Sequence, residues 1–319
     1  MKVREIVMKK GKKIVILGAG NVGATIAYTL TISGMASEIV LIDINEEKAR
    51  GEAMDILQGT PFCPPVNIYS GTYEHATDAD IVIVTVGMAR KPGQTRLDLA
   101  QKNVDIIKMV MPRITARAPD AVYIVVSNPV DILTYVIAKT SGLPENQVIG
   151  SGTMLDSARL RSCLAEHLQL NPQNVHGYVL GEHGDTSVIP WSLVTVGGME
   201  MAKYCAHNAS GKGDLRDIED DVRTAGAKVI GFKGATYYAI ALSVRLMCEC
   251  ILRDMDSILT VSSMMHGQYG LEDVCLSVPF AVGAHGILRP ISVPLLPEEE
   301  KQLIHSGETL KTIIRSLDI

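Results

Sequence analysis

One histidine in this chain stands where it could exchange a proton with a small molecule. His183 lies in the segment Gly181-Glu-His-Gly-Asp185, directly after the apolar residues 178–180. We interpret 178–180 as a strand that breaks at Gly181 and presents His183 with little side-chain bulk beside it. An imidazole titrates near neutral pH, so this side chain could act as a general acid or base. A core histidine hydrogen-bonded to the backbone at a strand end would give the same local pattern.

A glycine-rich turn near the start of the chain has the spacing of a phosphate-binding loop. The segment Gly18-Ala-Gly-Asn-Val-Gly23 follows the apolar run 12–17 and precedes the helical apolar pattern of residues 24–32. In this order the first glycine permits a tight turn, the second lets the backbone approach a pyrophosphate, and the third lets helix and strand pack closely. The N-terminus of the helix then offers free N–H groups to phosphate. We therefore predict a dinucleotide site at Gly18, Gly20, Asn21, Val22 and Gly23.

Asp43 indicates which dinucleotide would bind. It ends the apolar run 38–43, about 20 residues beyond Gly23. An aspartate at this place accepts hydrogen bonds from the adenosine ribose hydroxyls and repels a 2′-phosphate, so NAD is favoured over NADP. The alternative is an acid at the N-terminus of the helix expected over residues 46–57.

The fold class follows from the alternation of apolar runs with helical patterns. In the first half of the chain these segments are 46–57, 80–86, 97–117, 121–127 and 130–141. Continuous apolar strands separated by helices predict an α/β fold with a doubly wound, parallel sheet of the Rossmann type, covered on both faces. Ligands of such sheets bind beyond the carboxyl ends of the strands, where we expect Gly87 and Asn128.

The loop 87–96 follows one of these strands and is a candidate lid. It begins with Gly87, is polar, and carries Arg90, Lys91 and Arg96. Over the predicted cleft, such a loop could close and expel water before the reaction. A loop that is merely solvated would look similar.

The pattern changes near residue 150, so we predict an NAD-binding domain over 1–150 and an α+β substrate domain over 151–319. Residues 153–168 predict a helix capped by Thr153. Asp156 and Arg159 share one of its faces because they are three residues apart, whereas Arg161 points roughly 200° around the helix from Arg159. Beyond it we expect helices at 216–230, 236–253 and 301–317, and antiparallel strands at 257–264, 274–281 and 283–290.

Composition narrows the class of protein. The chain has 319 residues, 47% of them hydrophobic, and a net charge of -5, which argues against nucleic acid or an anionic membrane as the main partner. No apolar run approaches the ~20 residues that span a bilayer, and the first residues lack the apolar core of a signal peptide. Six cysteines without a Cys-x-x-Cys pair are typical of reduced thiols. We expect a cytoplasmic protein without a metal site.

Five motifs together, over essentially the whole chain, resemble the L-lactate/malate dehydrogenase family, and most closely its bacterial L-lactate branch. They are the segment 18–23, Arg96, Ser127-Asn-Pro129, Asp156-Ser-Ala-Arg159 and the segment 181–185. The resemblance implies an NAD-dependent enzyme of fermentative glycolysis that interconverts small 2-oxo and 2-hydroxy acids. It also implies a homo-oligomer, a tetramer or a dimer.

The resemblance further implies a role for each polar side chain. His183 would donate a proton to the substrate carbonyl oxygen as hydride arrives from NADH, and take it back in the oxidation. Asp156 would orient the imidazole and stabilise its cation. Arg159 would hold the substrate carboxylate in a bidentate fork, and Arg96 would polarise the carbonyl group.

Thr236, Asn128 and Arg90 would complete the pocket, and Arg90 bears on the choice of substrate. The residue at this place is typically glutamine in lactate enzymes and arginine in malate enzymes of the family. An arginine would pair with the second carboxylate of oxaloacetate, whereas pyruvate would leave it unpaired inside a closed site. Taken alone, Arg90 predicts a malate dehydrogenase.

Other features favour a lactate dehydrogenase. Glu182 stands where related malate enzymes usually have glycine, and Trp191-Ser192 and the segment 234–238 also resemble lactate enzymes. Arg161 and His176 match the two residues with which bacterial lactate dehydrogenases bind fructose 1,6-bisphosphate across a subunit interface. Two ordinary interface residues are the alternative. We expect pyruvate as the substrate, with oxaloacetate as the alternative.

Two rival functions share the fold. A dinucleotide sensor without chemistry would tolerate the loss of His183, Asp156 or Arg96, yet all three are present. An NAD-dependent glycosidase would need a metal site with suitably placed cysteine and histidine, and the cysteines here are scattered.

Overall fold

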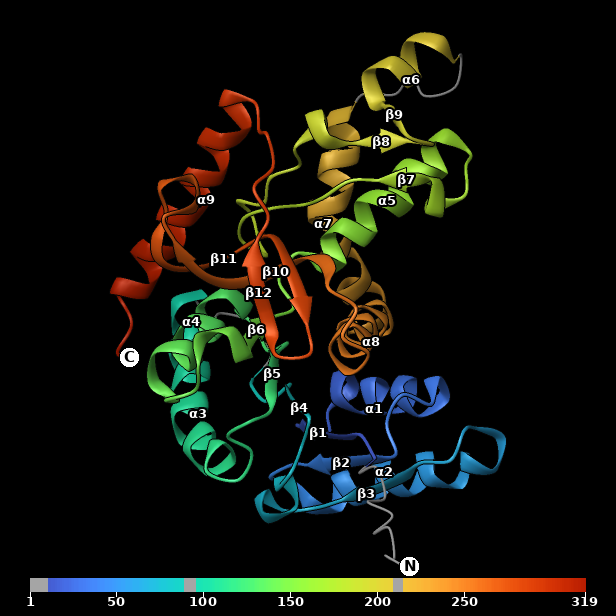
Figure 1. Cartoon of the computed structure of the whole chain (residues 1–319), viewed down its shortest axis with the longest axis vertical. Helices are drawn as coiled ribbons and strands as arrows, with labels where there is room; N and C mark the ends of the chain where they lie inside the picture. The colour runs from blue at the N-terminus through green and yellow to red at the C-terminus, as the bar shows by residue number, and fades with distance from the viewer. Residues whose placement is uncertain (1–10, 89–95, 209–214) are drawn as a thin grey trace, which may run out of the picture.

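The protein is seen in a computed structural model that describes residues 11–88, 96–208 and 215–319. Within these ranges, nine strands form one sheet in the order β12-β11-β10-β6-β5-β4-β1-β2-β3 (Figure 1). The strands of its N-terminal half are β1 (Lys13–Leu17), β2 (Glu38–Ile42), β3 (Asn67–Ser70), β4 (Ile81–Val84), β5 (Val122–Val125) and β6 (Val148–Gly150).

These six strands are all parallel and have the order 3-2-1-4-5-6. Nearly every residue of β1, β2, β4 and β5 is buried, as their continuous apolar sequences predict. The chain order reverses between β1 and β4, and in open α/β sheets this switch point is where ligands bind. The predicted Rossmann-type parallel sheet is confirmed.

Helices cover both faces of this sheet. Helices α1 and α2 lie against one face, and α3 and α4 lie together on the other. Figure 1 shows α8 lying beside α1, and α9 on the side of α4. The bounds of the helices in the N-terminal half are α1 (Asn21–Ser33), α2 (Glu46–Gln58), α3 (Arg96–Thr115) and α4 (Val130–Thr140).

The C-terminal half extends the same sheet and adds a second, smaller core. β10 runs antiparallel to β6, with Ser262 opposite Gly150, and is followed by antiparallel β11 and β12. The smaller core lies between α5, α7 and a short three-stranded sheet, β7-β8-β9. The bounds of these elements are α5 (Met154–Leu168), β7 (Val175–His176), β8 (Thr195–Val196), β9 (Met199–Glu200), α6 (Met201–His207), α7 (Leu215–Lys233), α8 (Tyr238–Leu252), β10 (Ser257–His266), β11 (Glu272–Gly283), β12 (Gly286–Pro290) and α9 (Pro297–Arg315).

The helices and antiparallel strands expected in the C-terminal half are present, and two local expectations were wrong. Residues 178–180 form no continuous strand: Leu180 makes an isolated bridge to Val188, and Gly181 one to Ser277. Thr153 caps no amide of α5, because its hydroxyl donates to the carbonyl oxygen of Val179 instead. Because one sheet crosses residue 150, the division into domains 1–150 and 151–319 stays a prediction. None of the described helices is long and apolar enough to cross a membrane.

Candidate active site

The glycine-rich turn joins β1 to α1 at the carboxyl edge of the sheet. Gly18 has a φ of +99°, in a region that side chains rarely adopt. Gly23 packs so closely under the turn that a Cβ there would overlap the carbonyl oxygen of Gly18, whereas a Cβ on Gly20 would meet no atom within 4 Å. The turn needs glycine at 18 and 23 for its own geometry, and Gly20 faces free space that a phosphate could enter.

Asp43 lies directly after β2 and ties that strand to the glycine-rich turn. Its Oδ2 accepts a hydrogen bond from the backbone amide of Ala19 at 2.6 Å, and its Oδ1 accepts one from the amide of Asn45 at 2.8 Å. The amide of Gly18 also donates to the carbonyl oxygen of Ile42. The acid predicted to bind the ribose therefore also fixes the phosphate loop.

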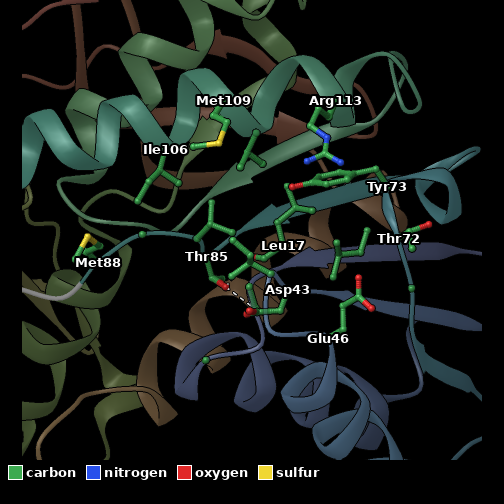
Figure 2. A pocket seen from close by; sticks show the side chains of 18 residues that line it. Leu17, Asp43, Glu46, Thr72, Tyr73, Thr85, Met88, Ile106, Met109 and Arg113 are labelled. Atoms are coloured by element: carbon green, nitrogen blue, oxygen red, sulfur yellow. Dashed lines mark hydrogen bonds between the residues drawn. The ribbon is translucent and has the colours of Figure 1, made fainter.

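A cleft of about 570 Å³ opens over this edge of the sheet. Gly18, Gly20, Asp43 and Gly87 all contribute to its lining, so four of the sequence-predicted cofactor residues, from three parts of the chain, meet there. Figure 2 shows the guanidinium of Arg113 lying over the ring of Tyr73, and the two are 4.2 Å apart. The sequence did not identify Arg113 and Tyr73 as cofactor-binding residues. It also did not identify several other residues that line the cleft, among them Glu46, Ile106, Met109 and Val110.

Asn103 of α3 connects the cleft with Asn128. This side chain is 1% exposed. Its Oδ1 accepts a hydrogen bond from the amide of Met88 at 2.8 Å, and its Nδ2 donates to the carbonyl oxygen of Asn128 at 2.7 Å. One buried amide thus holds the base of the 87–96 loop against the turn between β5 and α4.

His183, Asp156 and Arg159 meet as predicted. Asp156 Oδ2 lies 2.5 Å from His183 Nδ1, and Arg159 Nη1 donates to Asp156 Oδ1 at 2.9 Å. The Asp156 side chain is 10% exposed, while those of Arg159 and His183 are 16% and 26% exposed. One nearly buried carboxylate therefore holds two cationic side chains that keep some contact with solvent.

Electrostatics adjust the proton affinities of this pair. Burial alone would lower the pKa of His183, but the charge and hydrogen bond of Asp156 outweigh it, so the pKa of His183 is raised. Burial would raise the pKa of Asp156, yet His183 and Arg159 together lower it. The arrangement favours an imidazolium beside a carboxylate, which is a proton donor held in one orientation.

The loop that carries His183 is anchored from two further helices. The backbone amide of His183 donates to Oδ2 of Asp131 in α4 at 2.8 Å. The amide of Glu182, one residue earlier, donates to Ser306 Oγ in α9 at 2.8 Å. The Glu182 carboxylate accepts a hydrogen bond from the hydroxyl of Thr186. These contacts fix the backbone on both sides of the imidazole.

Two family models match nearly the whole chain. The NAD binding domain model of lactate/malate dehydrogenase matches residues 12–150, and the corresponding alpha/beta C-terminal domain model matches residues 153–317. The chain belongs to the lactate/malate dehydrogenase family. It is therefore an NAD-dependent oxidoreductase, and the predicted family and cofactor are confirmed.

Curated relatives and solved structures of this family align along almost their full length. The L-lactate dehydrogenase of Acetivibrio thermocellus is 51% identical over 310 residues, which are 97% of this chain and 98% of the relative. That of Thermoanaerobacterium saccharolyticum is 48% identical and covers 96% and 99%. The crystal structure of a minor L-lactate dehydrogenase from Enterococcus mundtii, in a ligand-bound form, superimposes with a TM-score of 0.94 at 41% identity, over 98% of this chain and 100% of that one.

The cleft fits the NAD of this family. Gly20 leaves the backbone open toward the cleft, so the pyrophosphate could approach the start of α1, where Asn21 and Val22 form the first turn. Asp43 and Glu46 give the cleft two carboxylates beside the loop, which suits ribose hydroxyls and disfavours a 2′-phosphate. Asn128, predicted near the nicotinamide, is exposed in the turn before α4.

The resemblance also predicts roles for Arg90, Arg96, Thr236, Arg161 and His176. Arg90 is outside the described residues, and so is the side chain of Arg96, the first residue of α3. Thr236 lies in the connection between α7 and α8 and is partly exposed. Arg161 lies near the backbone before His176, because its Nε donates to the carbonyl oxygen of Val175 at 2.8 Å.

Sequence reasoning missed Asp131, Asn103 and Ser306. A signal was present for Asp131, which is an acid among apolar residues in the 130–141 pattern, directly after the Ser127-Asn-Pro129 motif. Asn103 and Ser306 lie on helices whose polar residues are mostly solvent-exposed, and no local pattern sets these two apart.

Proposed function

We propose that this enzyme reduces pyruvate to L-lactate with NADH and catalyses the reverse oxidation. The observation that carries the proposal is the 2.5 Å contact between His183 Nδ1 and Asp156 Oδ2, with Arg159 on the other carboxylate oxygen. Bound NADH supplies the hydride, for which no protein side chain can substitute. Relatives named L-lactate dehydrogenase over almost their full length support the choice of substrate.

His183 is the proposed general acid. Because Nδ1 is engaged by Asp156, Nε2 is the ring nitrogen left to give its proton to the carbonyl oxygen of pyruvate. Asp156 raises the pKa of His183 against the opposing effect of burial, and this favours the protonated ring. In the oxidation of lactate the neutral imidazole takes the hydroxyl proton, and Asp156 stabilises the cation that forms.

Arg159 is the proposed anchor of the substrate carboxylate. One of its terminal nitrogens donates to Asp156, which fixes the plane of the guanidinium and leaves further N–H groups for a bidentate contact. The residue of α7 that faces the guanidinium is the small Gly226, where an added Cβ would lie 3.5 Å from Arg159 Nη2. Arg96 would polarise the carbonyl from the lid, with Asn128 and Thr236 at the edge of the pocket.

Malate dehydrogenase activity is the second candidate, and Arg90 favours it. An arginine in the lid would pair with the second carboxylate of oxaloacetate and would be costly to bury unpaired beside pyruvate. The deciding measurement is kcat/KM with NADH for pyruvate and for oxaloacetate. A preference for pyruvate supports the proposal, and a preference for oxaloacetate overturns it.

Arg90→Gln then tests the lid directly. If Arg90 faces the substrate, the variant raises the ratio of kcat/KM for pyruvate over oxaloacetate. An unchanged ratio would mean that Arg90 does not face the substrate.

We also propose that Arg161 and His176 bind fructose 1,6-bisphosphate as an activator. The support is that Arg161 Nε donates to the carbonyl oxygen of Val175, the residue before exposed His176, and that Arg161 points roughly 140° around the helix from Asp156. In this proposal the bisphosphate lowers the KM for pyruvate in the native enzyme and not in Arg161→Gln or His176→Gln. Equal kinetics with and without the bisphosphate would assign the pair to an ordinary interface.

A homo-oligomer, a tetramer or a dimer, is proposed as the working form. Neighbouring helices α1 and α8 expose large apolar side chains, among them Ile32 at 49% and Leu242 at 59%, as surfaces that associate do. Light scattering coupled to size exclusion gives the subunit number, and a monomer at micromolar concentration would contradict the proposal.

Six free cysteines, three of them buried, support a reducing, cytoplasmic location.

A further inference from the structure

Asp131 is a buried carboxylate that the mechanism above does not use. It lies in the first turn of α4, is 2% exposed, and accepts one hydrogen bond, from the backbone amide of His183, on Oδ2. Its other oxygen, Oδ1, has no hydrogen-bond partner in the described part of the chain. The fully buried hydroxyl of Ser262 in β10 faces the carboxylate and helps to lower its pKa, although the two make no hydrogen bond of good geometry.

Folding alone does not account for a charge at this place. A carboxylate buried this deeply is costly, because water no longer solvates it and only one hydrogen bond and the nearby Ser262 hydroxyl compensate for that loss. An asparagine has the same shape and could accept the same hydrogen bond from His183 without the charge. The carboxylate is therefore of use only if its negative charge acts on something nearby.

The positive charge on which it acts is the imidazolium of His183. Asp131 is bonded to the backbone of that residue, and Asp156 is bonded to its ring. Carboxylates from α4 and α5 thus both raise the pKa of the imidazole, and the positive charge of Arg159 opposes them.

We propose that Asp131 is a positioning residue of the reaction, which fixes the backbone of His183 and stabilises its imidazolium with a second negative charge. The inference rests on the proposed acid–base role of His183. Asp131 then has two effects, a hydrogen bond that positions the backbone of His183 and a charge that stabilises its imidazolium, and substitutions can separate them.

The charges around Asp131 support this assignment. Burial raises the pKa of Asp131 to about 6, although the Ser262 hydroxyl and His183 oppose the rise, and Glu182 adds to it. Cys275 of β11 is also near, and burial raises the pKa of its thiol well above the ordinary value, so it stays neutral. At neutral pH Asp131 is therefore ionised, and below about pH 6 it becomes neutral and its support of the imidazolium is lost.

The experiment compares Asp131→Asn with Asp131→Ala in the full-length enzyme. Asp131→Asn keeps an acceptor for the His183 amide and loses the charge. We expect it to lower the pKa of the His183 imidazole by about half a unit or more, measured by NMR titration of the enzyme without substrate. The pH at which kcat/KM for pyruvate falls should move down by the same amount, with the plateau value preserved.

Asp131→Ala removes the acceptor as well, so it should lower kcat by about tenfold or more at every pH. Asn at 131 should restore kcat and leave the pH profile shifted. Asp120→Asn, at an exposed position before β5, is the control for the loss of one negative charge. It should change neither the imidazole titration nor the profile.

A variant that preserves Asp131 guards against misfolding of the others. Ser262→Ala removes the hydroxyl that opposes the rise in the pKa of Asp131, so the carboxylate should bind its proton at higher pH. Its charge then supports the imidazolium less near neutrality, and the pKa of His183 measured by NMR should fall, by less than in Asp131→Asn. Superimposable imidazole titrations for native enzyme and Asp131→Asn, or for native enzyme and Ser262→Ala, would overturn the proposal. Absence of turnover with any 2-oxo acid in the native enzyme would instead overturn the proposed function, and the titration would still test Asp131.

Discussion

Oδ2 of Asp156 lies 2.5 Å from Nδ1 of His183, and the two residues come from different elements, α5 and the loop after β7. The other oxygen of the same carboxylate accepts a hydrogen bond from Arg159. A single side chain thus sets the orientation of both the proposed acid and the proposed substrate anchor. Its replacement should affect chemistry and binding together.

Asp156→Asn should lower kcat by about 10²–10⁴-fold. An amide cannot stabilise the imidazolium as a carboxylate does, and Arg159 loses its charged partner, so KM for pyruvate should rise as well. Steady-state kinetics at neutral pH measure both effects. Glu166→Gln, an exposed acid on the same helix, is the matched control, and comparable losses in the two variants would remove Asp156 from the site.

The pH dependence should have opposite signs in the two directions of the reaction. Pyruvate reduction needs the imidazolium, whose pKa is raised by Asp156 against the opposing effect of burial. Its kcat/KM should therefore stay level through the ordinary histidine pKa of about 6.5 and fall tenfold per unit only above the raised value. Lactate oxidation needs the neutral ring and should rise through the same pH. A midpoint at or below the ordinary pKa would contradict the stabilising role of Asp156.

The glycine-rich turn offers a contrast between two neighbouring substitutions. Gly20→Ala should leave stability nearly unchanged, because the new Cβ meets no protein atom within 4 Å. It should raise the Kd for NADH on the order of tenfold, since the methyl group enters the space for the pyrophosphate. Gly23→Ala places its Cβ against the carbonyl oxygen of Gly18, so it should cost about 2–3 kcal/mol of folding free energy.

Thermal unfolding without cofactor and NADH fluorescence titration separate these two effects. The reverse assignment, a destabilised Gly20→Ala protein and a native-like Gly23→Ala protein, would mean that the turn is built differently.

Asp43 should affect NADH affinity as well as specificity. Its Oδ2 holds the amide of Ala19 in the phosphate loop, and a serine is too short to keep this bond while meeting a ribose. Asp43→Ser should weaken NADH binding and reduce the preference for NADH over NADPH, each by about tenfold. Glu46→Gln removes the other acid of the cleft and leaves the loop intact, so it should reduce the preference alone. Kd values for both cofactors decide the matter.

The sequence was sufficient for the sheet and for those site residues that occur in motifs. The glycine spacing, Asp43 and the 156–159 pair follow from local spacing in the sequence. The structure brings Asp43 to the glycine-rich turn and Asp156 to Arg159. Asp131 and Ser306 hold the His183 loop through backbone amides, and the sequence says nothing about which amide a distant side chain will meet. The expected strand at 178–180 failed for a similar reason, since its partners are single residues far along the chain.

Asn103 should prove important although it touches neither the imidazole nor Asp156 in the described structure. It bonds the amide of Met88 and the carbonyl oxygen of Asn128 while almost fully buried. Asn103→Leu fills the same space and leaves both backbone groups unpaired, at a cost of about 1–3 kcal/mol for each. Asn103→Asp keeps the acceptor for Met88 and turns a carboxylate oxygen toward the carbonyl of Asn128. Both variants should raise KM for pyruvate, because Met88 at the start of the 87–96 loop and the turn at Asn128 lose their common support. Only the leucine variant should also lose NADH affinity, through a displaced Gly87. Urea unfolding, the KM for pyruvate and the Kd for NADH test this. A leucine variant with native stability and native KM would show that the hydrogen bonds of Asn103 do not support the site.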